Sequence, residues 1–365
     1  MQLPPAADQR SARDGAPLRA RQLLKLRRQL LYLQNHSPVY RPLLERAGLS
    51  WRTLDDVEEL RRLPLTTFED LRARQLAAPS PDAAASGVSI AAVPTPLPTG
   101  DLTTCPAERV RRIYPAPLPA GGSCFFGVSD RDLSLWVRLA REALLDRGMR
   151  QGERVLHLAL SRHAALDAAL LALEEIGAVG ILANLEEMSS LVEEGRLDAV
   201  CAPVSCAMQV EEALRSCEVK RGGARLARYY VGDLGDPAAW PGEDEPWGSK
   251  ERRDQAAKRA DTAGHAGAAL LVGVPGIAPV LLASCPNHAG FHEDAGEYCF
   301  SEIINPESGE ALPWQDGSRG ELVLTPLERE CTPLLRLRTG VVVQLHTGPC
   351  ACGRSSVRLA PADVS

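Results

Sequence analysis

The stretch RVLHLALSRHAALDAALLALEEIGAVGILAN, residues 154–184, decides the fold class. Its first seven and last seven residues are short apolar runs typical of buried strands. The Ala- and Leu-rich run between them has a helical pattern over residues 166–176. A strand, a helix and a second strand in this order predict a βαβ unit, whose two strands lie parallel in one sheet.

The same alternation continues to residue 232. Strands that are apolar throughout and alternate with helices predict a mostly parallel sheet with helices on both faces. The segments are EEMSSLVEEG (helix, 186–195), LDAVCAP (strand, 197–203), SCAMQVEEALRSC (helix, 205–217) and ARYYVG (strand, 227–232).

The last third of the chain has a different pattern. After a polar, highly charged insertion at about 233–264, short apolar runs are separated by Gly, Pro, Asn and Asp turns, which favours antiparallel strands. We therefore expect an α/β fold with parallel and mixed sheets covered by helices, followed by a C-terminal antiparallel β subdomain. The runs are GAALLVG, EYCFSEIINP, GELVLTPLE, PLLRLRT and VVVQLHT.

The N-terminal part predicts helices. Residues 19–33 form a basic amphipathic pattern that we expect to pack against the body, with a membrane surface as the alternative. Two short helices are expected after Thr53 and after Thr66 or Thr67, and a long one from the cap at Ser129 to Gly148. The apolar stripe of the first helix is Leu23, Leu24, Leu26, Leu30 and Leu31.

Composition excludes several classes of protein. A net charge of -6 gives no basic field for nucleic acid, and 45% hydrophobic with 24% charged residues is ordinary globular usage. The N-terminus has no apolar run followed by a cleavage site, and no stretch approaches a membrane span. We therefore expect a cytoplasmic protein, in which clustered cysteines indicate metal or catalysis more often than disulfides.

The cysteines give the sharpest local signal. Cys350 and Cys352 form a C-x-C pair in GPCACGR, and SCPNHAGFH contains Cys285, His288 and His292. Three thiolates and one imidazole would complete a tetrahedral zinc site, although free thiols on a loop are the alternative and the spacing does not choose between the histidines. The other seven cysteines are interpreted as packing residues: Cys105, Cys124, Cys201, Cys206, Cys217, Cys299 and Cys331.

One loop is a candidate for binding phosphate. The run PLPAGGSCFFG, residues 117–127, contains Gly121, Gly122 and Ser123, whose backbone N–H groups suit an anion. It has no Lys, and its two prolines remove two donors, so an ordinary turn is the stronger reading.

Several blocks resemble the phenylacetate-CoA ligases, a branch of the AMP-forming acyl-adenylating superfamily that includes coenzyme F390 synthetase-like proteins. The blocks are NHSPVYRPLLERAGLSWRTLDDVEELRRLPLTTFEDLR, GVSDRDLSLWVRLAREAL, EIINPESGEALPWQDGSRGELVLTPLERECTPLLRLRT and GPCACGR. The resemblance implies the large N-terminal domain of an ATP-dependent acid-CoA ligase. It also implies a structural zinc held by Cys285, His292, Cys350 and Cys352, which leaves His288 spare.

The same resemblance implies that the nucleotide site is degenerate. The family's loop SSGTTGKPT aligns with APLPAGGSC at 116–124, where Gly121 alone matches. The carboxylate of YGLSE, which helps to hold magnesium, falls at Gly276 in VGVPG, and the ribose-binding Asp of RYRTRD falls at Val341 in RLRTGV. Arg338 is retained, together with Arg336 and Thr339.

We therefore predict an adenylation-defective pseudoenzyme with a structural zinc, and with ATP and magnesium doubtful as cofactors. It would bind a small carboxylic acid, an acyl group or a partner protein, and a homodimer is possible. The alternative is an active adenylating enzyme with an atypical nucleotide site and its lid supplied in trans, because the family's C-terminal lid domain is not expected here. The expected organisation is a tail (1–16), a helical segment (17–76), an α/β core (77–265), a β-rich part with zinc (266–358) and a tail (359–365).

Overall fold

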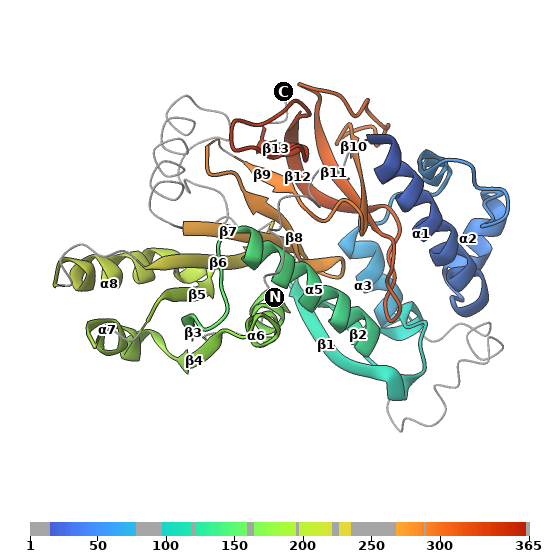
Figure 1. Cartoon of the computed structure of the whole chain (residues 1–365). Coiled ribbons are helices and arrows are strands. Elements are labelled where there is room, and N and C mark those ends of the chain that lie inside the picture. The colour runs from blue at the N-terminus through green and yellow to red at the C-terminus, as the bar shows by residue number, and fades with distance from the viewer. Residues whose placement is uncertain are drawn as a thin grey trace, which may run out of the picture.

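A mixed sheet of eleven strands organises the computed structural model, in the order β10-β11-β12-β13-β9-β8-β7-β6-β5-β3-β4 (Figure 1). The structure describes residues 15–77, 97–118, 121–158, 164–194, 197–220, 226–234, 268–287 and 290–362. The expected insertion at about 233–264 lies almost wholly outside these residues, as does His288. The described strands confirm the α/β fold class.

One half of the sheet is parallel, as the opening stretch predicts. Strand β3 pairs with both β4 and β5, and the parallel order continues through β6 to β7. The strands are β3 (Arg154–Leu158), β4 (Val179–Ala183), β5 (Ala199–Pro203), β6 (Ala227–Asp233) and β7 (Ala268–Val274), and the intervening helices are α6 (Ala164–Ile176), α7 (Leu185–Glu193) and α8 (Ala207–Lys220).

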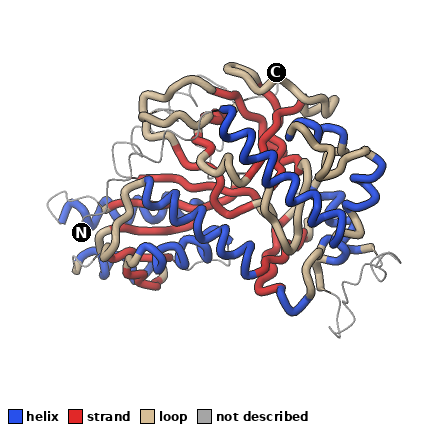
Figure 2. Tube along the Cα trace, turned by 45° about the vertical axis from the view of Figure 1, so that its right-hand side comes forward, coloured by secondary structure: helices blue, strands red, loops and turns tan. Residues whose placement is uncertain are grey.

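The other half is antiparallel. Loops and strands make up this region near the C-terminus, whereas helices frame the parallel strands (Figure 2). The runs PLLRLRT and VVVQLHT were expected as two strands, but the end of the first and most of the second form one continuous strand, β12. The strands are β8 (Ala278–Ser284), β9 (Phe291–Glu293), β10 (Cys299–Ile304), β11 (Arg319–Pro326), β12 (Leu337–His346) and β13 (Arg358–Pro361).

The N-terminal segment has its own apolar core. Its helices are α1 (Gly15–His36), α2 (Tyr40–Arg46), the 3-10 helix η2 (Val57–Arg62) and α3 (Phe68–Leu76). Thr67 caps α3 as expected, but Asp56 and not Thr53 caps η2. The predicted stripe of α1 was partly wrong, because Leu24 and Leu31 are exposed while Leu26, Leu30 and Leu33 are buried.

Helix α5 (Asp130–Asp146) and the hairpin of β1 (Val110–Pro117) and β2 (Ser123–Ser129) connect the segment to the sheet. Ser129 caps α5 as the sequence predicts, and it forms a capping box with Asp132. Two further 3-10 turns, η4 (Gly100–Leu102) and η5 (Ala107–Arg109), precede the hairpin, and η6 (Val204–Cys206) follows β5. Among the described residues, no helix is long and apolar enough to span a membrane.

Candidate metal centre and nucleotide positions

The sheet order brings the proposed metal ligands together. Cys285 directly follows β8, His292 lies in β9, and Cys350 and Cys352 lie between β12 and β13. Strands β8, β9, β13 and β12 are neighbours in the sheet. The four ligand atoms lie within 4.8 Å of one another. The Sγ atoms of Cys285 and Cys350 are 3.5 Å apart, and Sγ of Cys352 is 3.2 Å from Nε2 of His292.

Backbone turns hold these ligands close to the sheet. The N–H of Cys285 donates to the carbonyl oxygen of Gly290 at 3.0 Å. The N–H of Gly353 donates to the carbonyl oxygen of Cys350 at 2.9 Å. Gly290 has a φ of +103°, and a Cβ there would meet the carbonyl oxygen of Leu359 at 2.3 Å. Only glycine fits at this close approach between two chain segments.

A second layer of polar contacts orients the histidine. Nδ1 of His292 lies 3.0 Å from the carbonyl oxygen of Ser356, which suits an Nδ1–H donor and leaves Nε2 free to act as a ligand. The hydroxyl of Ser356 donates to Asp294, whose carboxylate also contacts Arg354 at 2.6 Å and Arg147 at 3.1 Å. Sequence reasoning missed Ser356 and Asp294, because nothing in their spacing marks them.

The donor set fits zinc. Zn–S bonds of about 2.3 Å in a tetrahedron place the ligand atoms about 3.8 Å apart, close to the separations found here. Burial lowers the pKa of His292, so its imidazole is neutral, as a metal ligand must be. Burial raises the pKa of Cys285 and of Cys352, and a bound cation would reverse this by favouring their thiolates. The cluster can therefore bind a metal.

The loop aligned with the family's phosphate loop is a tight turn between β1 and β2. The N–H of Gly121 donates to the carbonyl oxygen of Leu118 at 2.9 Å. The N–H of Leu118 donates to the carbonyl oxygen of Gly122 at 3.0 Å. Ser123 is paired with Pro117 across the hairpin. The turn therefore uses the Gly121 N–H internally instead of presenting it to a phosphate.

A cation nevertheless lies beside this turn. A Cβ on Gly122 would lie 3.9 Å from Nη2 of Arg72, which belongs to α3. Arg72 also stacks over the ring of Phe125, with 6.0 Å between the guanidinium carbon and the ring centroid. Sequence reasoning missed Arg72, because it is about fifty residues before the loop and only the tertiary structure makes them neighbours.

The position aligned with the magnesium carboxylate is filled by another side chain. Gly276 lies in the turn between β7 and β8 with a φ of +80°. A Cβ there would meet the Phe126 ring at 2.5 Å, and Phe126 is itself buried. A carboxylate at residue 276 therefore requires Phe126 to move.

The retained arginines bind other parts of the protein. Arg338 contacts Glu321, with Nε 3.1 Å from the carboxylate, and donates to the carbonyl of Pro306 at 2.8 Å. Arg336 pairs with the buried Glu302 at 3.2 Å and donates to the carbonyl of Leu63 at 2.6 Å. These contacts give both arginines structural roles, while Val341 lies partly exposed in β12 with no charge to offer.

A polar cluster joins β1 to α6 close to His157 of β3. The carboxylate of Asp167 on α6 accepts from Tyr114 at 2.7 Å and from Arg112 at 3.0 Å. His157 is buried nearby, and its Nδ1 has no hydrogen-bond partner. Burial raises the pKa of Tyr114 to about 12, so its hydroxyl is protonated and donates. Arg162 and His163, two further polar residues of the stretch 154–184, lie outside the described residues.

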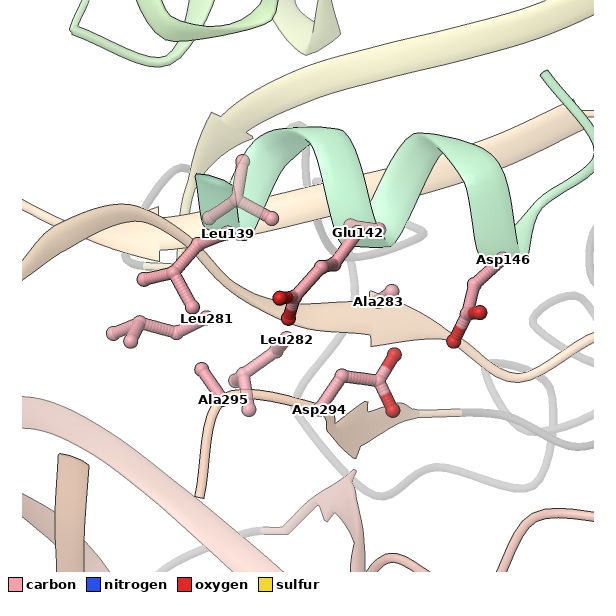
Figure 3. Close-up of a pocket in the computed structure, with 10 residues that line it drawn as sticks. Leu139, Glu142, Asp146, Leu281, Leu282, Ala283, Asp294 and Ala295 are labelled. Carbon is pink, nitrogen blue, oxygen red and sulfur yellow. The ribbon is translucent and has the colours of Figure 1, made fainter. Parts of the chain in front are cut away.

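Two small pockets lie further along the sheet. The first is lined by α5, β8 and the turn after β9, and Figure 3 shows the carboxylates of Glu142, Asp146 and Asp294 around it. The space that a water-sized molecule can enter is about 10 Å³ in each. That is room for about one water molecule, so neither pocket holds a nucleotide or an acyl group.

Comparisons with known proteins agree with the sequence blocks. A phenylacetate-coenzyme A ligase of Thermus thermophilus is 26% identical over 354 residues, which cover 94% of this chain and 69% of the relative. A phenylacetate-coenzyme A ligase of Escherichia coli is 25% identical over 338 residues, which cover 91% of this chain and 68% of the relative. The chain is a relative of the phenylacetate-CoA ligases. It spans about two thirds of their length, and no family model matches it.

Solved structures support the same fold. An open 2-hydroxyisobutyryl-CoA ligase in complex with 2-HIB-AMP and CoA superposes with a TM-score of 0.74, at 22% identity, over 98% of this chain and 78% of that one. The same ligase in its thioesterification state gives 0.75 at 21% identity, over 99% and 71%. The architecture of this phenylacetate-CoA ligase relative is therefore that of an acyl-CoA ligase.

Proposed function

We propose that this phenylacetate-CoA ligase relative no longer adenylates carboxylic acids and acts by binding. The carrying observation is that a Cβ at Gly276 would meet the Phe126 ring at 2.5 Å, so a carboxylate at this position, which the resemblance aligns with the family's magnesium ligand, would collide with that ring. The closed turn at Gly121 supports the same conclusion.

The chemistry explains why these changes matter together. Adenylation requires cations and oriented N–H donors to stabilise the charge on the triphosphate. Removing one preorganised donor typically costs about 10² to 10³ in rate. A missing lysine, a missing carboxylate and a missing ribose-binding Asp at Val341 remove three contacts at once.

The proposed ligand is a small carboxylic acid or an acyl group, with a partner protein as the other possibility. Arg112 and Tyr114 contact Asp167, whose charge acts on His157 near the carboxyl end of β3, where ligands of α/β sheets usually bind. We place the protein in the cytoplasm and allow for a homodimer.

The second proposal concerns the metal. We infer that Cys285, His292, Cys350 and Cys352 hold a structural zinc, since three thiolates and one imidazole leave no open coordination position. Zinc there would cross-link β8, β9 and the connection from β12 to β13. The contacts of Ser356 and Asp294 with His292 and Arg354 fix the orientation of this connection.

Arg72 is the observation that favours an active enzyme instead. Its guanidinium lies beside Gly122, where it can supply positive charge in place of the family's lysine. The alternative is therefore an acid-adenylating enzyme with an atypical nucleotide site.

Pyrophosphate exchange separates the two functions. The full chain is assayed with ATP, magnesium and a panel of aryl and short-chain carboxylic acids, and ATP binding is measured by calorimetry. We expect neither exchange nor ATP binding. Exchange that is lost in Arg72→Met but retained in the control Arg52→Met would overturn the binding proposal and establish the active alternative.

A further inference from the structure

Among the described strands, β4 lies at the edge of the sheet, and no described strand covers its outer side. Strand β4 is last in the sheet order and pairs with no other described strand than β3. The N–H of Val179 donates to the carbonyl of Glu153, at 2.8 Å, on the β3 side. Because these groups alternate along a strand, the N–H and C=O groups of Gly180 and Leu182 point away from β3.

The side chains of β4 do not protect this edge. Val179 and Leu182 are 54% and 61% exposed, and the strand sequence VGILA contains no charge and no proline. Natural edge strands usually carry such residues to prevent pairing with other chains. Val179 and Leu182 are three residues apart, so their side chains lie on opposite faces of the sheet. An added strand can therefore make apolar contacts on both faces.

The segment that carries this edge is acidic, although the exposed Arg154 of β3, which contacts Asp198, pairs with Val179 on the inner side. Residues 164–194, which include α6, β4 and α7, contain seven acidic residues and no Lys, Arg or His. Glu174 and Glu175 are exposed near the start of β4, and Glu186 and Glu187 are exposed just after its end. Figure 1 shows α6 and α7 next to β4 at the margin of the molecule. Negative charge therefore flanks both ends of an apolar strand edge.

We propose that the outer edge of β4 binds an extended peptide segment in which a short apolar run is flanked on both sides by basic residues. The segment adds a strand to the sheet through the backbone groups of Gly180 and Leu182. Its apolar side chains cover Val179 and Leu182, and its basic residues face the glutamates at both ends. The inference does not depend on whether the chain adenylates acids.

A second copy of this chain is a poorer occupant. Two β4 strands related by a two-fold axis would pair antiparallel, which places the start of one strand against the end of the other. That arrangement brings Glu174 and Glu175 of one copy toward Glu186 and Glu187 of its partner, and like charges oppose pairing. A basic segment gains from the same charges.

The test uses a labelled ten-residue peptide with four central Val residues and three Lys residues on each side, and its binding to the full chain is measured by fluorescence anisotropy. We expect saturable binding that weakens with salt, and slower hydrogen exchange at the amides of Gly180 and Leu182 when the peptide is present. The matched peptides carry Glu in place of Lys, or N-methyl groups on alternate amides, and neither should bind.

Variants place the binding on β4. Leu182→Lys should weaken binding about tenfold or more, because it removes an apolar contact and adds a like charge. Leu76→Lys, at an equally exposed leucine on α3, is the control and should leave binding unchanged. Reversal of charge at Glu175 and Glu186 should weaken binding, whereas the same reversal at Glu307 and Glu310 should not.

Three outcomes would overturn the proposal. Equal binding by the Lys and Glu peptides, or unchanged exchange at Gly180 and Leu182, contradicts strand addition by a basic segment. The third outcome is self-association of the chain, measured by sedimentation velocity. If Leu182→Lys abolishes this self-association and the peptide does not compete with it, the edge binds a second copy of the chain instead.

Discussion

The Cys/His cluster and the nucleotide positions lie in one chain, and their side chains have different neighbours. At the cluster, three sulfurs and one imidazole face a common centre, and Ser356 and Asp294 orient the imidazole from behind. At the nucleotide positions, Phe126 fills the space at Gly276 and the Gly121 N–H bonds within its own turn. One region brings its potential ligand atoms together, and the other uses its groups in contacts within the protein.

The difference teaches which parts of the ligase architecture the fold itself requires. Arg336 is retained and contacts Glu302 and Leu63, so it joins the N-terminal helices to the β-rich part. At Gly276 and Val341, where the resemblance places two of the family's carboxylates, this chain carries no charged side chain. Four experiments can break or sharpen this comparison.

The largest effect is expected from replacing both Cys350 and Cys352 by Ser. Zinc binding contributes about 10 kcal/mol or more to the folding of small zinc domains. Metal content should fall from near one per chain to near zero, and Tm should drop by about 10 °C or more. Elemental analysis measures the metal content, and calorimetry measures Tm. Cys206→Ser, outside the cluster, is the control, and a folded, metal-free wild-type chain would refute the zinc site.

Arg336→Met tests the structural role of a retained arginine. The substitution leaves Glu302, which is 1% exposed, without its closest cation. Breaking a buried pair in this way costs about 3–5 kcal/mol. Urea denaturation should show this loss, while the exposed control Arg319→Met should change stability by less than about 0.5 kcal/mol. A loss no larger than in the control would mean that Arg336 is free for another function.

Gly276→Glu attempts to restore the magnesium carboxylate. A φ of +80° and the nearby Phe126 ring should make the variant about 1–3 kcal/mol less stable without any gain of ATP binding. Adding Phe126→Ala provides space, so the crowding part of the cost should disappear from the double-mutant cycle. Magnesium-dependent ATP binding by the double variant would show that the nucleotide site is only blocked and not lost.

The smallest effect concerns acid stability at His157. Burial lowers the pKa of this imidazole in the folded state. Its stabilisation is therefore complete above the unfolded value of about 6.5 and is lost as pH falls below it, by at most about 1.4 kcal/mol per pH unit. His157→Leu should flatten the stability profile between pH 7 and 5, measured by urea denaturation. The exposed control His36→Gln should retain the slope, and an unchanged slope in His157→Leu would assign the acid sensitivity elsewhere.

Local patterns predicted much of the fold. Thr67 and Ser129 cap their helices as expected, and the structure shows that each does so in a capping box, in which a hydroxyl and an acid three residues later accept from each other's backbone N–H groups. The buried face of α1 was predicted less well. Leucines cover more than one side of that helix, so periodicity could not choose Leu26 and Leu30 over Leu24 and Leu31.

Residue types by themselves determined the strand and helix alternation of residues 154–184 and the candidate donors Cys285, Cys350 and Cys352, because periodicity and ligand chemistry are local properties. Only the tertiary structure brought His292 to Cys352, put Arg72 beside Gly122 and put Phe126 against Gly276. These neighbours come from distant segments and from the order of strands in the sheet. No local pattern encodes that order, since it depends on which apolar faces pack together.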